Sequence, residues 1–361
     1  MERLTIPFVA GAAAGALCAR FCQFPAAAAP FSGTSLCLAA TAAALACYRP
    51  ERKAPFVLLF FFLGFFCFCS DSMLPDRLLP DFVTGFPARA AERLRARILS
   101  VPYRDGRSAA LVCAVLTGDR SLLDSALTAA FRGSGASHIL ALSGLHMGLV
   151  CALVRRGTLV LGNSPTARYC RCALCCGFAL FYTIATGATA SAQRACIFII
   201  ITEWAAVSQR RRSSPAQKLN AALTLQLALR PRVITSAAFQ LSYMAMAGII
   251  LLNPILQGWF PQPVSKAGSR FNLPKKIWEI TAMSLSCQVF TAPVAYIHFG
   301  TFPKYFLLAN LIALPLTSVM ISLAVLVMIL HGTGICPAFL VSASEAVIHA
   351  LIRSMEIISG M

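Results

Sequence analysis

Long apolar stretches, separated by short polar or basic segments, dominate this chain. Most of them are close to the roughly 20 apolar residues that a helix needs to cross a bilayer. The pattern therefore predicts an all-α, polytopic integral membrane protein with about ten transmembrane helices. The predicted spans lie near residues 5–23, 32–48, 54–70, 136–154, 172–188, 193–208, 218–230, 237–256, 278–299 and 303–330.

Three apolar stretches leave alternatives open. The stretch 218–230 is short and contains Gln226, which is compatible with a re-entrant or a buried segment. The stretch 303–330 is long and contains Pro315, so it is either two segments or one kinked helix. The stretch 337–358 is either an eleventh span or an interfacial helix. Its ionisable residues are Glu345, His349, Arg353 and Glu356.

Residues 71–135 interrupt the alternation of apolar stretches and short polar segments, because this segment is long and carries charges of both signs. Within it, Ala88–Leu99 reads ARAAERLRARIL, which places Ala, Leu and Ile on one helical face and the charges on the other. This pattern predicts an amphipathic helix that lies at the membrane surface. We expect it to contact lipid headgroups, with DNA as the alternative, through Arg89, Arg93, Arg95 and Arg97.

The rest of this segment predicts short elements. The apolar run 108–116 is too short to cross a bilayer. Thr117-Gly118-Asp119 is typical of a turn, and residues 121–131 predict a short helix.

The first apolar stretch is compatible with a signal peptide, but a second stretch follows almost at once, which favours a retained span. Gly11 and Gly15 form a G-x-x-x-G pattern, which lets another helix approach closely. This spacing is common in Ala-rich spans, so it indicates packing rather than a particular partner.

Composition excludes two broad classes. Only 12% of the 361 residues are charged, 58% are hydrophobic and the mean hydropathy is +0.73. Soluble domains carry about 25% charged residues, so a soluble enzyme is excluded. The apolar content also excludes a disordered chain.

The net charge of +18 is used to predict the orientation. With a cytoplasmic N-terminus, the inner loops hold fifteen lysines and arginines and the short outer loops hold three. Because cytoplasmic loops collect these residues, we expect a plasma-membrane protein with its N-terminus in the cytoplasm. Residues 71–135 are then extracytoplasmic.

Sequence signatures of catalysis or cofactor binding are lacking. The chain has no P-loop, no dinucleotide fingerprint and no H-E-x-x-H motif, so we expect no enzymatic activity, no cofactor and no metal. Cys172 and Cys175 form a C-x-x-C pair without a second pair at zinc spacing, and we interpret the fifteen cysteines as small apolar residues. Ser143 and His146 could meet as a hydrolase pair, but no acid orients the base.

Polar residues inside the predicted spans are the candidates for function. His138 and His146 lie eight residues apart, about 12 Å and 80° on a straight helix, so they would not share a metal ion. Such groups either hydrogen-bond neighbouring helices or line a hydrated pathway. Arg194 either snorkels from a helix end or marks a pathway mouth. The candidate pathway-lining residues are His138, Ser143, His146, Thr186, Arg194, Gln240 and Asn310.

Several of these residues carry a family likeness. Residues 85–330 resemble the membrane channel domain of ComEC-type competence proteins. Ser137-His138-Ile-Leu-Ala-Leu-Ser143-Gly144-Leu-His146 is similar to the family's S-H-x-L-A-x-S-G-x-H signature. The other matching segments are Leu116 to Arg120, Thr186-Gly187 to Arg194-Ala195, Phe239 to Ser242, Phe299-Gly300 and Ala309 to Pro315.

The resemblance implies an inner-membrane channel that passes single-stranded DNA into the cytoplasm during transformation. The alternative is a transporter or scaffold of the same fold that no longer moves DNA. That alternative is suggested because the family's OB-like and metallo-β-lactamase-like domains find no match here. Besides the lipid bilayer, the expected partners are single-stranded DNA, a separate DNA receptor, a nuclease and a cytoplasmic ATP-driven translocase.

The sequence thus predicts three regions. Residues 1–70 form an N-terminal hydrophobic region of three spans, 71–135 form the extracytoplasmic segment, and 136–361 form a channel domain of the competence type.

Overall fold

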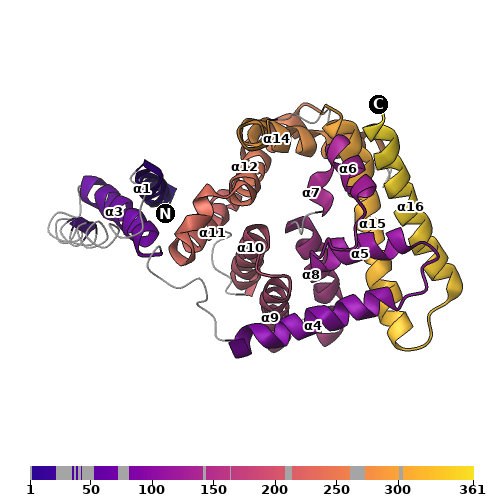
Figure 1. The fold of residues 1–361 in the computed structure, drawn as a ribbon. Coiled ribbons are helices and arrows are strands. Elements are labelled where there is room, and N and C mark those ends of the chain that lie inside the picture. The colour runs from indigo at the N-terminus through magenta and orange to yellow at the C-terminus, as the bar shows by residue number, and fades with distance from the viewer. Residues whose placement is uncertain are drawn as a thin grey trace. The chain divides into compact units, whose positions relative to one another are not determined.

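The computed structural model describes residues 2–21, 35, 38–39, 42, 53–71, 81–140, 144–162, 164–207, 214–260, 273–300 and 304–361. Every regular element in these ranges is helical, which confirms the predicted all-α class (Figure 1). The α-helices are α1 (Glu2–Phe21), α3 (Lys53–Asp71), α4 (Asp81–Leu99), α5 (Gly106–Thr117), α6 (Ser125–Gly133), α7 (Ser137–Leu140), α8 (Gly144–Gly157), α9 (Pro165–Ala185), α10 (Ala190–Val207), α11 (Pro215–Leu229), α12 (Ala237–Leu251), α13 (Asn253–Gly258), α14 (Leu273–Phe299), α15 (Phe306–Gly332) and α16 (Ala338–Ser359). Two 3-10 turns, η1 (Thr158–Leu161) and η2 (Pro231–Thr235), complete the set.

The chain divides into two compact units. The first comprises residues 1–80 and 204–243, and the second comprises residues 81–203 and 244–361. The division falls inside α10 and α12, so each of these helices contributes to both units. The predicted regions 1–70, 71–135 and 136–361 follow the sequence rather than this division and stay a prediction.

In the first unit, α1 and α3 pack at backbone contact distance. A Cβ atom on Gly11 would lie 1.8 Å from the carbonyl oxygen of Phe61, and one on Gly64 would lie 2.0 Å from that of Phe8. A Cβ atom on Gly15 would meet the side chain of Phe68 at 3.1 Å. The predicted close approach at the G-x-x-x-G surface is therefore confirmed.

Helix α11 belongs to the same unit and begins at a capping box. The backbone N–H of Gln217 donates to Ser214 Oγ, and the backbone N–H of Ser214 donates to Gln217 Oε1, which satisfies two groups at the helix end. Gln226 is 1% exposed, and its Oε1 accepts a 2.9 Å hydrogen bond from the Tyr243 hydroxyl. This burial agrees with the interpretation of 218–230 as a buried segment.

The second unit is built around α5. Its residues from Ala110 to Leu116 are all buried, and they pack in one apolar cluster with side chains of α6, α7, α15 and α16. Asp105 caps α5 at one end, and Gly118, with a φ of 79°, ends it in the left-handed conformation. The apolar run 108–116, which is too short to cross a bilayer, thus lies in a core helix. The predicted turn at 117–119 is confirmed.

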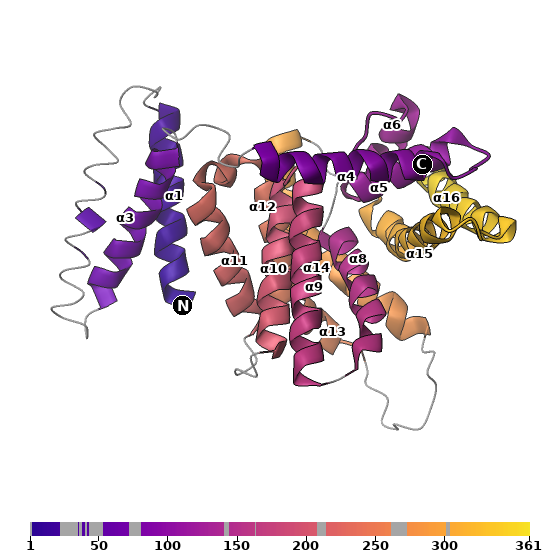
Figure 2. The same ribbon diagram turned by 90° about the horizontal axis from the view of Figure 1, so that it is seen from below.

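Helix α4 lies across the C-terminal end of α9 (Figure 2). Its apolar face contacts protein: Ile98 is 2% exposed in the main core, and Leu94 packs against that core. The predicted amphipathic helix is present, but its apolar side is covered by α5, α9 and α15.

Among the residues that the structure describes, four helical segments are long and apolar enough to cross a membrane: Ala237–Gly258, Leu273–Phe299, Phe306–Gly332 and Ala338–Ser359. The predicted number of about ten spans is not confirmed. Pro315 lies inside one continuous helix, α15, so the two-segment alternative for 303–330 is wrong. In the stretch 136–154 the structure describes α7 and α8, and residues 141–143 between them lie outside the described residues. The predicted span 32–48 falls largely outside the described residues.

Candidate functional site

The two histidines of the signature lie on different helices. His138 is in α7, a single turn, and its side chain is exposed. His146 is in α8 and is 1% exposed, next to Met147 in a small core formed by α8, α9 and α10. The sequence could not predict this difference, because a continuous span would have placed both histidines in one helix. Ser143 lies outside the described residues.

Arg194 reaches the first residue of α8 from α10. A Cβ atom on Gly144 would lie 2.9 Å from Nη2 of Arg194 and 3.5 Å from Cβ of Ala195. The guanidinium group therefore occupies the space that a side chain at position 144 would take. The structure brings Arg194 and the signature glycine together, which favours the interior position over snorkelling from a helix end.

The segment Leu116 to Arg120 is held by contacts on two sides. The hydroxyl of Tyr182 in α9 donates to the carbonyl oxygen of Leu116. Nε of Arg120 donates a 2.9 Å hydrogen bond to the carbonyl oxygen of Leu140, the last residue of α7. This loop is the part of the family likeness whose role the sequence did not indicate.

Arg95 of α4 fixes the same loop from the outside. Its Nη1 lies 2.9 Å from Oδ2 of Asp119, and its Nη2 donates to Ser121 Oγ at 3.3 Å. Hydrogen bonds from the backbone N–H and the side chain of Ser121 lower the pKa of Asp119 from its ordinary value of 3.8, and the nearby Arg95 contributes to the shift. The charged form of this carboxyl group is therefore stabilised in the folded chain.

We expect Asp119→Asn to lower the thermal midpoint of the purified protein at about pH 7, with a difference from wild type that shrinks as the pH falls below 3.8 and through the lowered folded-state pKa. A carboxyl group with a lowered folded-state pKa stabilises the fold above its unfolded pKa, and this contribution is lost as the pH falls through the folded-state value. Melting curves of both proteins across this range provide the measurement. A difference in thermal midpoint that stays constant down to the lowest pH measured would show that the charge of the carboxylate does not contribute to stability.

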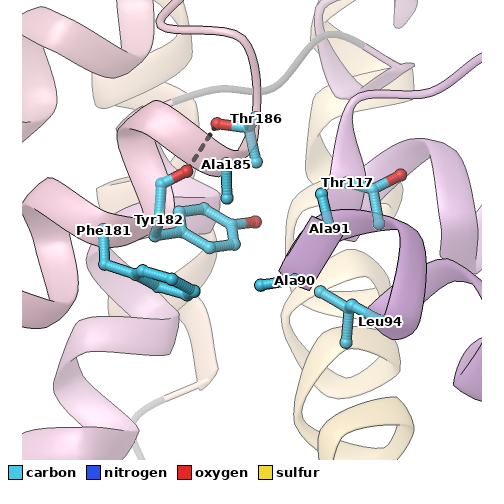
Figure 3. Close-up of a pocket in the computed structure, with 8 residues that line it drawn as sticks. All are labelled: Ala90, Ala91, Leu94, Thr117, Phe181, Tyr182, Ala185 and Thr186. Carbon is cyan, nitrogen blue, oxygen red and sulfur yellow. Dashed lines mark hydrogen bonds between the residues drawn. The ribbon is translucent and has the colours of Figure 1, made fainter. Parts of the chain in front are cut away.

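Thr186 caps the C-terminus of α9, where its Oγ1 donates to the carbonyl oxygen of Tyr182 at 2.8 Å. Beside it, a cavity of about 30 Å³ separates α4 from α9 (Figure 3). This volume suits about one water molecule and lies far below the several hundred Å³ of ligand pockets. Its lining residues are Ala90, Ala91, Leu94, Thr117, Phe181, Tyr182, Ala185 and Thr186.

The two remaining candidate pathway-lining residues, Gln240 and Asn310, belong to different units. Gln240 belongs to the first unit, where its Nε2 donates to the carbonyl oxygen of Ile234 at 2.8 Å. Asn310 belongs to the second unit, and its buried Oδ1 accepts no hydrogen bond from the described residues. Thus the second unit contains His138, His146, Thr186, Arg194 and Asn310, and Gln240 is described apart from them.

The four arginines of α4 have different environments. Arg89 and Arg93 are exposed, Arg95 pairs with Asp119, and the guanidinium of Arg97 lies over Gly332 at the C-terminal end of α15, where a Cβ atom would be 2.0 Å from Nη2. A cation at a helix C-terminus is favourable. Two of the four predicted surface arginines therefore lie against other parts of the protein.

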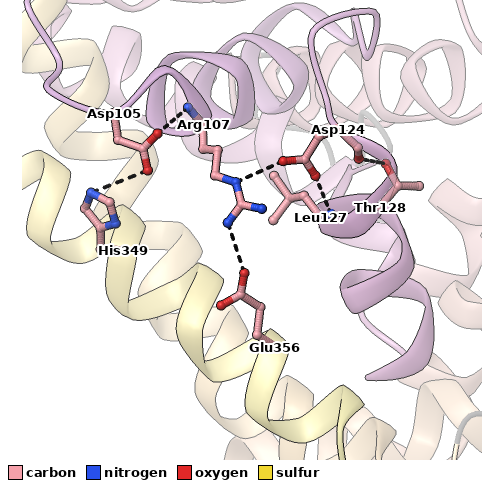
Figure 4. Close-up of polar contacts among 7 residues, drawn as sticks. All are labelled: Asp105, Arg107, Asp124, Leu127, Thr128, His349 and Glu356. Atoms are coloured by element: carbon pink, nitrogen blue, oxygen red, sulfur yellow. Dashed lines mark hydrogen bonds and ion pairs between the residues drawn. The ribbon is translucent and has the colours of Figure 1, made fainter.

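The polar network between α5, α6 and α16 was not predicted from the sequence (Figure 4). Arg107 pairs with Asp124 at 2.9 Å and with Glu356 at 3.2 Å. The buried carboxylate of Glu345 accepts the backbone N–H of Asp105 at 2.8 Å. The sequence contains a pattern that could have predicted this network. The spacing of the ionisable residues along 337–358 places Glu345, His349 and Glu356 on one side of a helix.

Glu203 and the cysteines have local partners. Glu203 pairs with Arg155 at 2.8 Å. Among the described cysteines, Cys113, Cys151, Cys172, Cys175 and Cys196 are buried. This burial fits the interpretation of cysteine as a small apolar residue.

A helical chain with four segments apolar enough to cross a bilayer, and with polar side chains buried between its helices, is a membrane protein with a partly polar interior. A model of the family described as Competence protein matches residues 115–361, so the chain belongs to that family and the resemblance is confirmed.

ComE operon protein 3 of Bacillus subtilis (strain 168) is 26% identical over 209 residues, a match that covers 58% of this chain and 24% of that relative. The chain thus matches about a quarter of the relative's length. No solved structure matches the chain.

Proposed function

We propose that this protein is a multi-pass plasma-membrane channel component that passes single-stranded DNA into the cytoplasm. Membership of the Competence protein family over residues 115–361 is the observation that carries this proposal. The N-terminus is cytoplasmic in this proposal, and the chain itself is not an enzyme. Energy comes from a separate ATP-driven translocase, because the sequence contains no P-loop.

The interior of the second unit supports a polar pathway. His146 is buried in α8, and Arg194 of α10 lies against the first residue of that helix. Ionisable groups inside a membrane are costly and usually face protein or a water-filled cavity. A buried cation beside a passing strand would interact favourably with its phosphates.

The test is DNase-protected entry of labelled double-stranded DNA into cells. We expect a deletion strain to bind DNA at its surface normally, to lose entry, and to regain it on complementation. Arg194→Ala and His146→Ala should each reduce entry at least about tenfold at normal protein level, since each removes a buried polar group from the pathway.

One outcome would contradict the proposal, and another would contradict only the assignment of the pathway residues. Entry that is equal in wild type and deletion strain would show that the protein is not required. Normal entry with both substituted proteins would exclude the assigned residues while leaving the channel itself in place.

A transporter of the same fold for another solute is the second candidate. It is favoured by the arginines of α4, since Arg95 and Arg97 contact protein rather than a polyanion. Loss of a small anion's uptake, with unchanged DNA entry in the deletion strain, would support it.

A further inference from the structure

We propose that the end of α8, the turn η1 and the start of α9 form a binding site for an anionic phospholipid. In this site the apolar side chains of η1 enter the acyl-chain region, and Arg156 and Arg168 contact the phosphate of the headgroup. The inference goes beyond the proposed function, because it does not depend on which solute the protein moves.

The turn η1 exposes apolar side chains directly after the basic end of α8. Val160 is 92% exposed, and Leu159 and Leu161 are each more than half exposed. Tyr169 of α9 is also more than half exposed, and tyrosine is typical of the membrane interface. Helices α8 and α9 both contact η1 and meet at this end (Figure 2). An exposed apolar patch of this kind marks a membrane or protein interaction site.

The charge around this turn is positive. Residues 155–172 contain four arginines and no aspartate or glutamate. Arg155 is neutralised by Glu203 of α10 at 2.8 Å. Arg156 is exposed and Arg168 is half-buried, and neither forms an ion pair with a carboxylate among the residues that the structure describes. Two cations beside an apolar turn suit an anionic headgroup that lies above its acyl chains.

Arg171 adds positive charge from beneath the turn. This arginine is 9% exposed, and its Nη2 donates a 2.7 Å hydrogen bond to the carbonyl oxygen of Gly162, the residue after η1. Its Nε is buried and has no acceptor within the described ranges. A buried cation whose hydrogen-bond partner is a neutral carbonyl is stabilised when an anion binds nearby. Arg171 therefore holds the turn and favours an anion next to it.

The start of α9 contributes to the same positive potential. Ser164 caps this helix, where its Oγ accepts the backbone N–H of Ala167 at 3.1 Å. Arg168 is the fourth residue of α9. The N-terminal end of a helix carries a partial positive charge, so a cation is unfavourable there and an anion is favourable. A phosphate at this position thus interacts favourably with both the arginine and the helix end.

The predicted orientation places this site at the cytoplasmic leaflet. Anionic lipids give that leaflet a negative surface potential, which attracts arginines close to the membrane. A phospholipid supplies both parts that the site needs, a phosphate for the arginines and acyl chains for η1. Phosphatidylglycerol is therefore the probe, and phosphatidylcholine is the comparison lipid without net charge.

The test is binding of each fluorescently labelled lipid to the purified full-length protein in a neutral detergent. We expect the wild type to bind phosphatidylglycerol at least about tenfold more tightly than phosphatidylcholine. Arg156→Gln and Arg168→Gln should each weaken binding of phosphatidylglycerol about tenfold, as expected for the loss of one hydrogen bond between charged groups. Binding of phosphatidylcholine should stay within about twofold of wild type in both variants.

Arg132→Gln is the matched control for net charge. Arg132 is an exposed arginine in the last turn of α6, and its substitution removes the same charge from another part of the second unit. We expect this variant to bind phosphatidylglycerol within about twofold of wild type, because exposed charges far from a site are screened by salt.

Val160→Glu tests the apolar part of the site. Because Val160 is almost fully exposed, the substitution should leave the melting midpoint in lipid-free detergent unchanged. It should weaken binding of phosphatidylglycerol about tenfold, since a carboxylate is repelled by the headgroup and is costly to place in hydrocarbon.

Several results would overturn the inference. Equal affinity of the wild type for both lipids would show that the charge of the headgroup is not recognised. Unchanged binding in Arg156→Gln and Arg168→Gln, or an equal loss in Arg132→Gln, would exclude this site. Full displacement of the lipid by glycerol 3-phosphate would identify a site for a soluble phosphate compound. Displacement by a single-stranded oligonucleotide at the same phosphate concentration would identify a nucleic-acid contact.

Discussion

Replacing Gly144 with alanine is expected to reduce DNA entry about tenfold without reducing the amount of folded protein. The added Cβ atom would lie 2.9 Å from Nη2 of Arg194. That atom is the far end of a flexible side chain, so the guanidinium moves and the backbone does not need to. The variant thus displaces the charge without removing it, and entry of labelled DNA is the measurement.

Gly148→Ala is the matched control, since it lies one helical turn further along α8 and its Cβ atom would meet nothing within 4 Å. We expect normal entry in this variant. Normal entry in Gly144→Ala would show that the position of the Arg194 guanidinium is unimportant. A fall in protein level equal to the fall in entry would attribute the effect to folding.

Replacing Gly248 with alanine should have a large effect on the stability of the second unit. Its Cβ atom would lie 2.2 Å from the carbonyl oxygen and 2.9 Å from the carbonyl carbon of Ser286. A backbone carbonyl group cannot change its rotamer as a side chain can. Helices α12 and α14 must therefore move apart to relieve the clash. Overpacking of this kind costs about 1–3 kcal/mol, which for a chain of this length corresponds to a midpoint lowered by roughly 1–4 °C in detergent melting curves.

Gly177→Ala provides the comparison, because this glycine lies inside α9 with open space where the Cβ atom would be. Alanine is the better helix former by about 1 kcal/mol, so this variant should be equal to wild type or slightly more stable. A midpoint for Gly248→Ala equal to that of Gly177→Ala would contradict the close approach of α12 and α14.

Hydropathy predicted the helical class and the position of several helices, because it depends only on local composition. Helices α14, α15 and α16 coincide with the stretches 278–299, 303–330 and 337–358 to within a few residues. The same signal cannot tell lipid from protein as the apolar partner. For that reason the apolar face of α4 was assigned to the membrane, whereas Ile98 and Leu94 pack against other helices.

The sequence names candidate site residues, and their membership of a pathway stays a prediction, but it does not indicate how they are arranged. A motif can indicate that Gly144 and Arg194 matter, but the contact between them depends on how α8 and α10 pack. The same holds for Arg120, whose acceptor is a backbone carbonyl twenty positions away. Non-local contacts of this kind leave no periodic signal in the sequence.

The contacts of α16 imply an order in which the helices are inserted and packed. Its Glu345 and Glu356 side chains bond to the Asp105 backbone and the Arg107 guanidinium, groups that are synthesised 240 and 249 residues earlier. Presented alone to a bilayer, α16 would expose the Glu345 carboxylate to hydrocarbon, and a charge near a helix centre costs about 2.5–3.5 kcal/mol. The partner surface on α5 therefore has to be in place when α16 is inserted, so α16 packs against protein that has already assembled.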